Sequence, residues 1–138
     1  MKTQHWLVKS EPTTYAWKDF SRDGRTDWTG VRNNAARLHL RAMRPGDRVF
    51  FYESMTTKAI LGVAEVTRAA CPDATADEPG WVAVELKMVR ALARPVTLAA
   101  VKAEPKLAGI ALLRISRLSV QPLDPESFRL IEKLGAVA

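Results

Sequence analysis

Apolar and polar residues change their spacing several times along the chain, and the spacing predicts a mixture of strands and helices. A period of two, or a run of aromatic and β-branched residues, is typical of strands. On these grounds we expect strands over residues 5–9, 48–54, 59–67, 81–89 and 118–122. Apolar residues three or four apart are typical of amphipathic helices. They predict helices over residues 15–21, 34–43 and 125–134, a shorter helix over 97–102, and another short turn over 107–113.

Individual residues predict how these elements face, where they end and which residues cap them. Alternation within 59–67 should place Leu61 and Val63 on one face of a strand, with Ile60, Ala64 and Val66 on the other. Gly135 should stop the last helix. Residues 22–25 are expected to form a turn and residues 70–80 a surface connection. The expected helix N-caps are Thr13 or Thr14 for the first helix, and then Asn33, Thr97 and Asp124.

The order of these elements predicts the fold class. Strands and helices are mixed without strict βαβ alternation, and no internal repeat or long linker divides the chain. We therefore expect a single domain over residues 1–138, of the α+β class. Its sheet should be mainly antiparallel and curled into a small β-barrel flanked by helices.

The amino-acid composition indicates what kind of molecule the protein binds. The chain has 138 residues and a net charge of +6 at pH 7, and its cations are mostly Arg. Arg suits bidentate contact with phosphates, so the charge favours a polyanionic partner. The lone Cys71 cannot form an internal disulfide, and neither a signal peptide nor a membrane-spanning run is visible. We expect a monomer without a membrane partner, in the cytoplasm, or in the nucleus if the source is eukaryotic.

The usual catalytic signatures are missing from the sequence. It contains no GxGxxG, GxxxxGK[ST], HExxH, GxSxG or paired CxxC motif. With His5, His39 and one Cys, a protein-bound metal is not expected. We therefore predict no catalytic residues, no metal and no cofactor, and a protein that is not an enzyme.

Polar and aromatic residues instead cluster at predicted strand ends and loops. Partly buried Lys, Glu, Arg and Asn side chains need partners, so a fold does not bring them together without cost. Taken singly, each is better explained by capping, core packing or a surface ion pair. Taken together, they predict a ligand-binding pocket formed by Lys9, Ser10, Glu11, Trp28, Arg32, Asn33, Tyr52, Ser54, Ser116, Arg117 and Ser119.

At these residues the chain resembles the EVE domain family. The segments that carry the resemblance are Trp6-Leu7-Val8-Lys9-Ser10-Glu11-Pro12, Trp28-Thr29-Gly30-Val31-Arg32-Asn33, Gly46-Asp47 with Phe51-Tyr52, and the stretch from Leu113 to Val120. The resemblance spans essentially the whole chain and implies a PUA-like fold. It also implies a non-catalytic module that recognises a modified nucleobase, such as a modified cytosine in DNA or a modified base in RNA.

Such a pocket needs a stacking surface, groups for the base edge and cations for phosphates. Trp28 or Tyr52 can stack on a base, and Trp28→Ala is expected to weaken binding while leaving the fold intact. Asn33 is as well suited to capping a helix as to contacting the base edge. Lys9, Arg32 and Arg117 are candidates for phosphate contacts, or for pairing with Glu11.

Two departures from the family pattern bear on specificity. Asn34-Ala35 stands where the family often has an aromatic residue and Gln, and Glu53 stands where His is common. If these positions touch the ligand, base preference differs here, and Glu53 brings negative charge toward the site.

Two other functions remain open: an enzyme acting on nucleotides or modified nucleic acid, with Glu11 or Lys9 in acid–base roles, and a protein-interaction adaptor.

Overall fold

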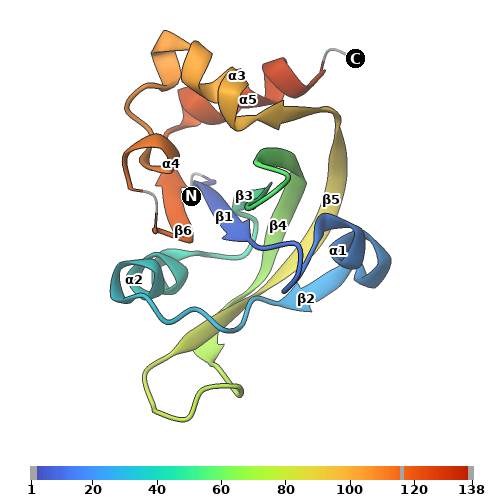
Figure 1. The fold of residues 1–138 in the computed structure, drawn as a ribbon. Helices are drawn as coiled ribbons and strands as arrows, with labels where there is room; N and C mark the ends of the chain where they lie inside the picture. Colours follow the sequence, from blue (N-terminus) through green and yellow to red (C-terminus); the bar gives the residue numbers. More distant parts are fainter. Residues whose placement is uncertain (1–2, 116, 137–138) are drawn as a thin grey trace.

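The computed structural model describes residues 3–115 and 117–136, in which six strands form one curled sheet (Figure 1). The strands are β1 (His5–Ser10), β2 (Arg25–Asp27), β3 (Arg48–Glu53), β4 (Ala59–Pro72), β5 (Val82–Thr97) and β6 (Val120–Leu123). They lie in the order β2-β5-β4-β3-β1-β6. β1 is parallel to β3, and the other neighbouring pairs are antiparallel. The mainly antiparallel, curled sheet predicted from the sequence is confirmed.

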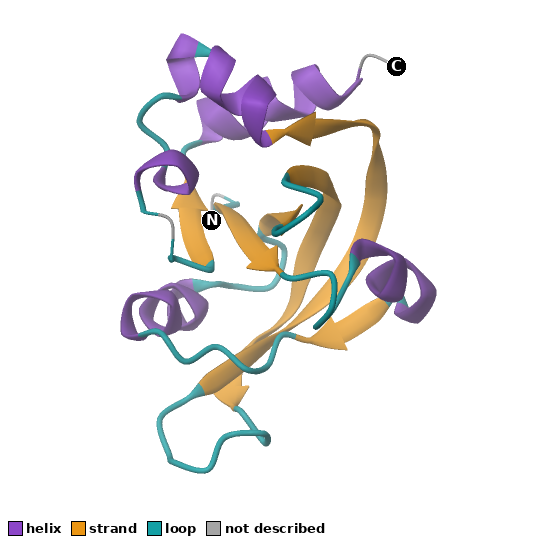
Figure 2. Ribbon diagram, viewed as in Figure 1, coloured by secondary structure: helices purple, strands orange, loops and turns teal. Residues whose placement is uncertain are grey.

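The helices lie toward opposite ends of this sheet (Figure 2). At one end are α3 (Leu98–Ala103), a 3₁₀ turn (Pro105–Leu107), α4 (Ala111–Arg114) and α5 (Pro125–Ala136). Toward the other end, where the β4–β5 hairpin projects, lie α1 (Trp17–Asp23) and α2 (Asn34–Ala42). Three of the predicted N-caps are confirmed, because Asn33, Thr97 and Asp124 accept hydrogen bonds from the amides of Ala36, Ala100 and Ser127. The cap predicted at Thr13 or Thr14 is wrong, because α1 begins only at Trp17 and its N-cap is Ala16.

Alternation along β1 and β3 divides the apolar side chains between two cores. In β1, Trp6 and Val8 point into a core shared with α1 and α2, whereas Leu7 points into a second core shared with α5. In β3, Phe51 belongs to the first core and Phe50 to the second. The sheet therefore has apolar layers on both faces, and the strands nearest the functional residues are held rigidly from both sides.

The structure corrects the predicted facing of Ile60. Ile60 packs in the same core as Val63, while Ala64 and Val66 lie in the other. The reason is a bulge, since the pairing between β3 and β4 passes from Phe51–Gly62 to Tyr52–Ile60 and leaves one residue of β4 unpaired. An extra residue reverses the alternation, and the sequence pattern gives no sign of it.

Element lengths also differ from the prediction. The expected turn at 22–25 ends in the short strand β2, and β4 and β5 extend well beyond 59–67 and 81–89 into a long hairpin. Gly135 does not stop the last helix, which continues to Ala136. A Cβ at Gly135 would lie 2.9 Å from Leu92 Cδ1 and 3.2 Å from the Arg94 carbonyl oxygen. The glycine thus permits close packing of α5 on β5 instead of ending the helix.

Candidate nucleic-acid interface

A cleft of about 570 Å³ opens between the end of β1, the segment before α1, and the loop that joins β2 to α2. The residues of the predicted site that line it are Lys9, Ser10, Glu11, Trp28, Arg32, Asn33 and Ser119. They come from three separate parts of the sequence. The fold therefore brings together most of the side chains that the sequence pattern singled out.

Backbone hydrogen bonds hold these segments beside one another. The Lys9 amide donates to the Ser119 carbonyl at 2.8 Å, which joins β1 to the segment before β6. The amide of Trp28 donates to the carbonyl of Val84 at 2.8 Å and so continues the pairing of β2 with β5. Because both contacts continue strand pairings of the sheet, the cleft rests on a rigid framework.

Trp28 forms the inner wall of the cleft and belongs to the core at the same time. Its side chain is only 7% exposed and packs edge-on against Phe51, with ring centroids 5.6 Å apart. Tyr15 meets Trp28 in a second edge-on contact at 6.2 Å and also lines the cleft. So little of Trp28 is exposed that a base cannot stack on its whole face. The half-buried Tyr15 presents more aromatic surface to a ligand.

The hydroxyl of Tyr15 is held in place from outside the cleft. It donates a hydrogen bond to Asp23 Oδ2 at 2.8 Å. Burial raises the pKa of Tyr15, and the neighbouring Asp23 carboxylate adds to this effect. The side chain is therefore a neutral phenol over the physiological range, with its ring fixed against Trp28.

Lys9 is a half-buried cation of the cleft. Its ammonium nitrogen lies 6.0 Å from the centroid of the ring of Tyr52, its partner on the neighbouring strand β3. Burial lowers the pKa of Lys9, because leaving water disfavours the charged form. A cation in this position is suited to a phosphate or another anionic group that enters the cleft.

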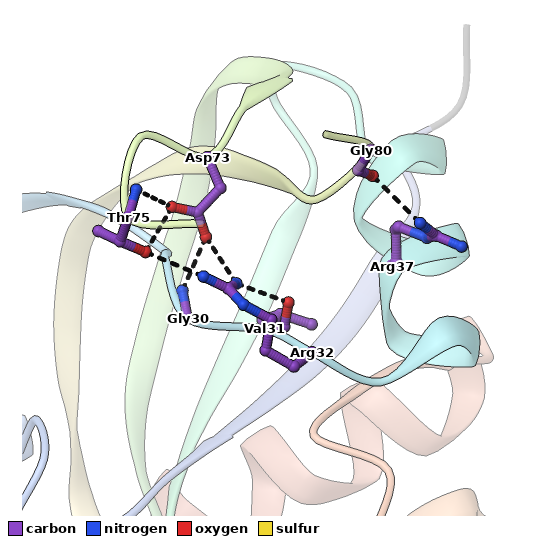
Figure 3. Close-up of polar contacts among 7 residues, drawn as sticks. All are labelled: Gly30, Val31, Arg32, Arg37, Asp73, Thr75 and Gly80. Carbon is purple, nitrogen blue, oxygen red and sulfur yellow. Dashed lines mark hydrogen bonds and ion pairs between the residues drawn. The ribbon is translucent and has the colours of Figure 1, made fainter. Parts of the chain in front are cut away.

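Arg32 pairs with Asp73 and not with Glu11. Its Nη1 lies 3.0 Å from Asp73 Oδ2, and its Nη2 donates to the hydroxyl of Thr75 at 3.2 Å. Both residues belong to the turn between β4 and β5, in the segment that we predicted to be a plain surface connection (Figure 3). The guanidinium is thus directed toward the hairpin, although 38% of the side chain remains exposed.

The structure shows the role of the Asn33 side-chain oxygen, for which the sequence left helix capping and base contact open. Its Oδ1 accepts the Ala36 amide at 2.9 Å, so capping is the role of that oxygen. The residue is exposed and lines the cleft. Because the oxygen caps α2, the amide nitrogen is the group of Asn33 that suits an acceptor on a base edge.

Other predicted site residues lie elsewhere. Tyr52 is 4% exposed and packs in the core shared with α5. Ser54 donates through its hydroxyl to the Ser10 carbonyl at 3.2 Å, so it supports β1 from behind. Arg117 is exposed and, like Tyr52 and Ser54, is not part of the cleft lining. Ser116 lies outside the described residues.

Neither departure from the family pattern reaches the cleft. Glu53 is buried, and its carboxylate accepts the Trp17 amide at 2.9 Å and the Thr57 hydroxyl at 2.5 Å. Asn34 accepts a hydrogen bond from Arg37 at 2.8 Å on the surface of α2. The expectation that Glu53 brings negative charge toward the site is therefore corrected, because its charge faces the first amide of α1.

Sequence reasoning missed several polar residues of the cleft. Their only signal is proximity, because each lies within a few positions of a predicted site residue. Tyr15 was interpreted as a bulky position of a helix, and the strand β2 was not expected. The residues concerned are Thr14, Tyr15, Thr26, Asp27 and Thr29.

A second cleft, of about 980 Å³, lies along α5 and holds none of the predicted site residues. Both acidic and basic side chains line it, including the ion pair of Arg90 with Glu132 at 2.5 Å.

In the described part of the chain, no group of three or more His, Cys, Asp or Glu side chains is placed to hold a metal ion. None of the described helices is long and apolar enough to cross a membrane.

Comparisons with known proteins agree with this architecture. The family model of the EVE domain matches residues 4–134. Human Thymocyte nuclear protein 1 is 31% identical, over 96% of this chain and 74% of its own length. A structure of human THYN1 protein in complex with 5-methylcytosine containing DNA superimposes with a TM-score of 0.92, at 30% identity and 99% coverage of each chain.

A bacterial structure is more similar to this chain in sequence than the human protein is. Rpa0253 from Rhodopseudomonas palustris, solved by NMR, is 50% identical, with a TM-score of 0.90 over 96% of this chain and 93% of that one. The PUA-like fold that the resemblance implied is confirmed by these neighbours. From the match of the family model over nearly the whole chain, we conclude that this protein belongs to the EVE domain family.

Proposed function

We propose that this chain acts as a single nucleic-acid-binding domain that receives a modified base in the cleft beside Trp28. The observation that carries the proposal is the composition of that cleft, in which an aromatic wall, a half-buried cation and exposed polar groups converge. The human relative bound to 5-methylcytosine containing DNA has the same fold and supports the assignment.

The side chains of the cleft suit a base that is no longer stacked on its neighbours in the strand. A methyl group on the base gains by packing against apolar surface, which Trp28, Tyr15 and Val31 supply. The hydroxyl of Ser10 donates its proton to the Tyr15 carbonyl at 2.7 Å, so toward a base edge it can serve as an acceptor, whereas the amide nitrogen of Asn33 can serve as a donor. Lys9 supplies charge for a flanking phosphate. Duplex DNA must flip the base to bring it here, whereas a single strand need not.

We favour binding over catalysis. The cleft contains the carboxylates of Glu11 and Asp27, but Asp27 pairs with Arg68 at 3.1 Å. No nucleophile within the described cleft has a base and an orienting group beside it, which a covalent or acid–base mechanism requires. Incubation with a modified oligonucleotide, followed by mass spectrometry, should return the oligonucleotide unchanged. Any product whose formation depends on Glu11 would support the enzyme alternative.

We propose a location and an oligomeric state that fit this ligand. With a nucleic-acid partner, the protein works in the cytoplasm of a bacterium, or in the nucleus if the source is eukaryotic. One cleft of this size holds one base, so a monomer is sufficient for binding.

Chemical-shift mapping tests the location of the site. A ¹⁵N-labelled sample is titrated with a short DNA strand that carries one 5-methylcytosine. The proposal expects the largest amide shifts in residues 9–11 and 28–33. Shifts concentrated along α5, in the larger cleft, would contradict it. A matched strand with plain cytosine shows which shifts depend on the methyl group.

A further inference from the structure

Asp73 is a buried carboxylate that lies outside the cleft lining. It is the first residue of the turn between β4 and β5, and its side chain is 0% exposed. A buried charge is costly unless hydrogen bonds and an opposite charge compensate it. The hairpin alone does not account for all of its partners, since two of them belong to the wall of the cleft.

The two oxygens of Asp73 face different segments (Figure 3). Oδ1 accepts the amide and the hydroxyl of Thr75, at 2.8 and 2.6 Å, and so shapes the hairpin turn. Oδ2 accepts the amide of Gly30 at 2.9 Å and Nη1 of Arg32 at 3.0 Å. One carboxylate therefore ties the hairpin to the loop that walls the cleft, through a backbone group and a charged side chain together.

Hydrogen bonding keeps this carboxylate ionised. Burial by itself would raise the pKa of Asp73. The bonds from Thr75, the Gly30 amide and Arg32 outweigh it and hold the pKa well below its ordinary value. At neutral pH the carboxylate of Asp73 is thus always ionised. Its negative charge is balanced by the positive charge of the Arg32 guanidinium in the wall of the cleft.

The wall needs such an anchor. Gly30 has a φ of +81° and is exposed, and this part of the chain is a loop that lies in neither a strand nor a helix. A loop without a partner would have to be ordered when a ligand arrives, and that ordering weakens binding. Trp81 adds to the anchor, because its ring lies 5.7 Å from the Arg32 guanidinium and 4.6 Å from that of Arg37.

We propose that Asp73 is a positioning residue for base binding: it holds Gly30 and Arg32 as a preformed wall of the cleft, and turns Arg32 toward the hairpin instead of toward a phosphate. This inference rests on the proposed function. It assigns Arg32 a role different from the phosphate contact that the sequence suggested, and it places a determinant of affinity on the β4–β5 hairpin.

The test compares Asp73→Asn with Asp47→Asn. Asp47 is also buried, and it accepts hydrogen bonds from Gln4, Trp6 and Arg44, none of which lines the cleft. Binding of the 5-methylcytosine strand is measured at several salt concentrations. Asp73→Asn should weaken binding about tenfold without changing the salt slope. Asp47→Asn should lower the melting temperature but keep the wild-type affinity.

A second variant tests the orientation of Arg32. Arg32→Gln should leave the salt slope unchanged, because a guanidinium held by Asp73 releases no counterion from the nucleic acid. A slope that falls by about one would overturn the proposal, since it would mark Arg32 as a phosphate contact. Tighter binding and a steeper slope in Asp73→Asn would overturn it as well.

Amide hydrogen exchange supplies a readout that needs no ligand, and its first part needs only the wild-type protein. The Gly30 amide of the wild-type protein should exchange slowly although the residue is exposed, and exchange should accelerate in Asp73→Asn but not in Asp47→Asn. Fast exchange of Gly30 in the wild type would overturn the proposed anchor. Failure of the wild type to bind any modified strand would instead count against the proposed function, and the exchange data would still decide the role of Asp73.

Discussion

Trp28 shows, at the scale of a single residue, how the cleft and the core share one side chain. Its ring packs on Phe51 and Tyr15 and is almost entirely buried. The sequence placed Trp28 at the site, because a tryptophan beside Gly30 and Asn33 lies in a polar loop. It could not show the burial, since that depends on Phe51 from a strand that is distant in sequence.

This burial changes what Trp28→Ala is expected to do. Removing a buried tryptophan leaves a cavity, so the variant should lose about 3–5 kcal/mol of unfolding free energy. The intact fold expected from the sequence therefore does not follow from the structure. Urea denaturation measures the loss, and Trp28→Phe, which keeps a ring against Phe51, should lose less. Equal stability of Trp28→Ala and the wild type would contradict the packing described.

Lys9 offers a cleaner test of the cleft because it is half-buried and takes no part in either core. Lys9→Gln should weaken binding of the 5-methylcytosine strand about tenfold and reduce the salt slope by about one, as expected for a lost phosphate contact. Lys18→Gln removes the same charge from the exposed surface of α1, outside the cleft. Fluorescence anisotropy compares the two variants. Equal effects would mean that net charge matters and Lys9 does not.

At the scale of elements, Glu53 links the end of β3 to the start of α1. Its carboxylate accepts the amide of Trp17, a bond that satisfies one of the otherwise unpaired amides of the helix. From the sequence, Glu53 differed from the family pattern beside an aromatic residue and suggested a change in base preference. The structure gives it a local partner instead, one that only the folded arrangement of β3 and α1 reveals.

Glu53→Gln should therefore affect stability and not recognition. The variant loses a charge-assisted hydrogen bond, which costs about 1–3 kcal/mol when the group is buried. Its affinity for modified and unmodified strands should equal that of the wild type. Thermal unfolding and anisotropy, measured on the same sample, decide the matter. Altered base preference at unchanged stability would show that Glu53 acts on the ligand.

The elements themselves were predicted unevenly, for physical reasons. Helices with a cap and an amphipathic face, such as α2, are encoded locally and were found nearly in full. The strand β2 has three residues and forms because β5 offers it a partner. The bulge in β4 likewise arises from pairing, not from the pattern of apolar residues. Lys9 and Asn33 stood out by motif, whereas Asp73 lay in a loop of ordinary turn residues and gave no signal.

For the molecule as a whole, two histidines make stability depend on pH. Burial lowers the pKa of His5 and of His39 below the ordinary value of 6.5. The folded state then favours neutral imidazole, so the stabilising contribution is complete above pH 6.5 and is lost as the pH falls below it. Urea denaturation at pH 7.5 and 5.5 should show lower stability at pH 5.5. A variant with His5→Gln and His39→Gln should show a smaller difference, and an unchanged difference would assign it to other groups.

The central claim, that this EVE domain reads a modified base, is tested most directly by one affinity comparison. The wild-type protein is titrated by fluorescence anisotropy with strands of identical sequence, in DNA and in RNA, that carry either an unmodified base or a modified one at a single position. The claim predicts that at least one modified strand binds at least tenfold more tightly than its unmodified counterpart, with an affinity that falls as salt rises. Equal affinity for every modified and unmodified pair would contradict it.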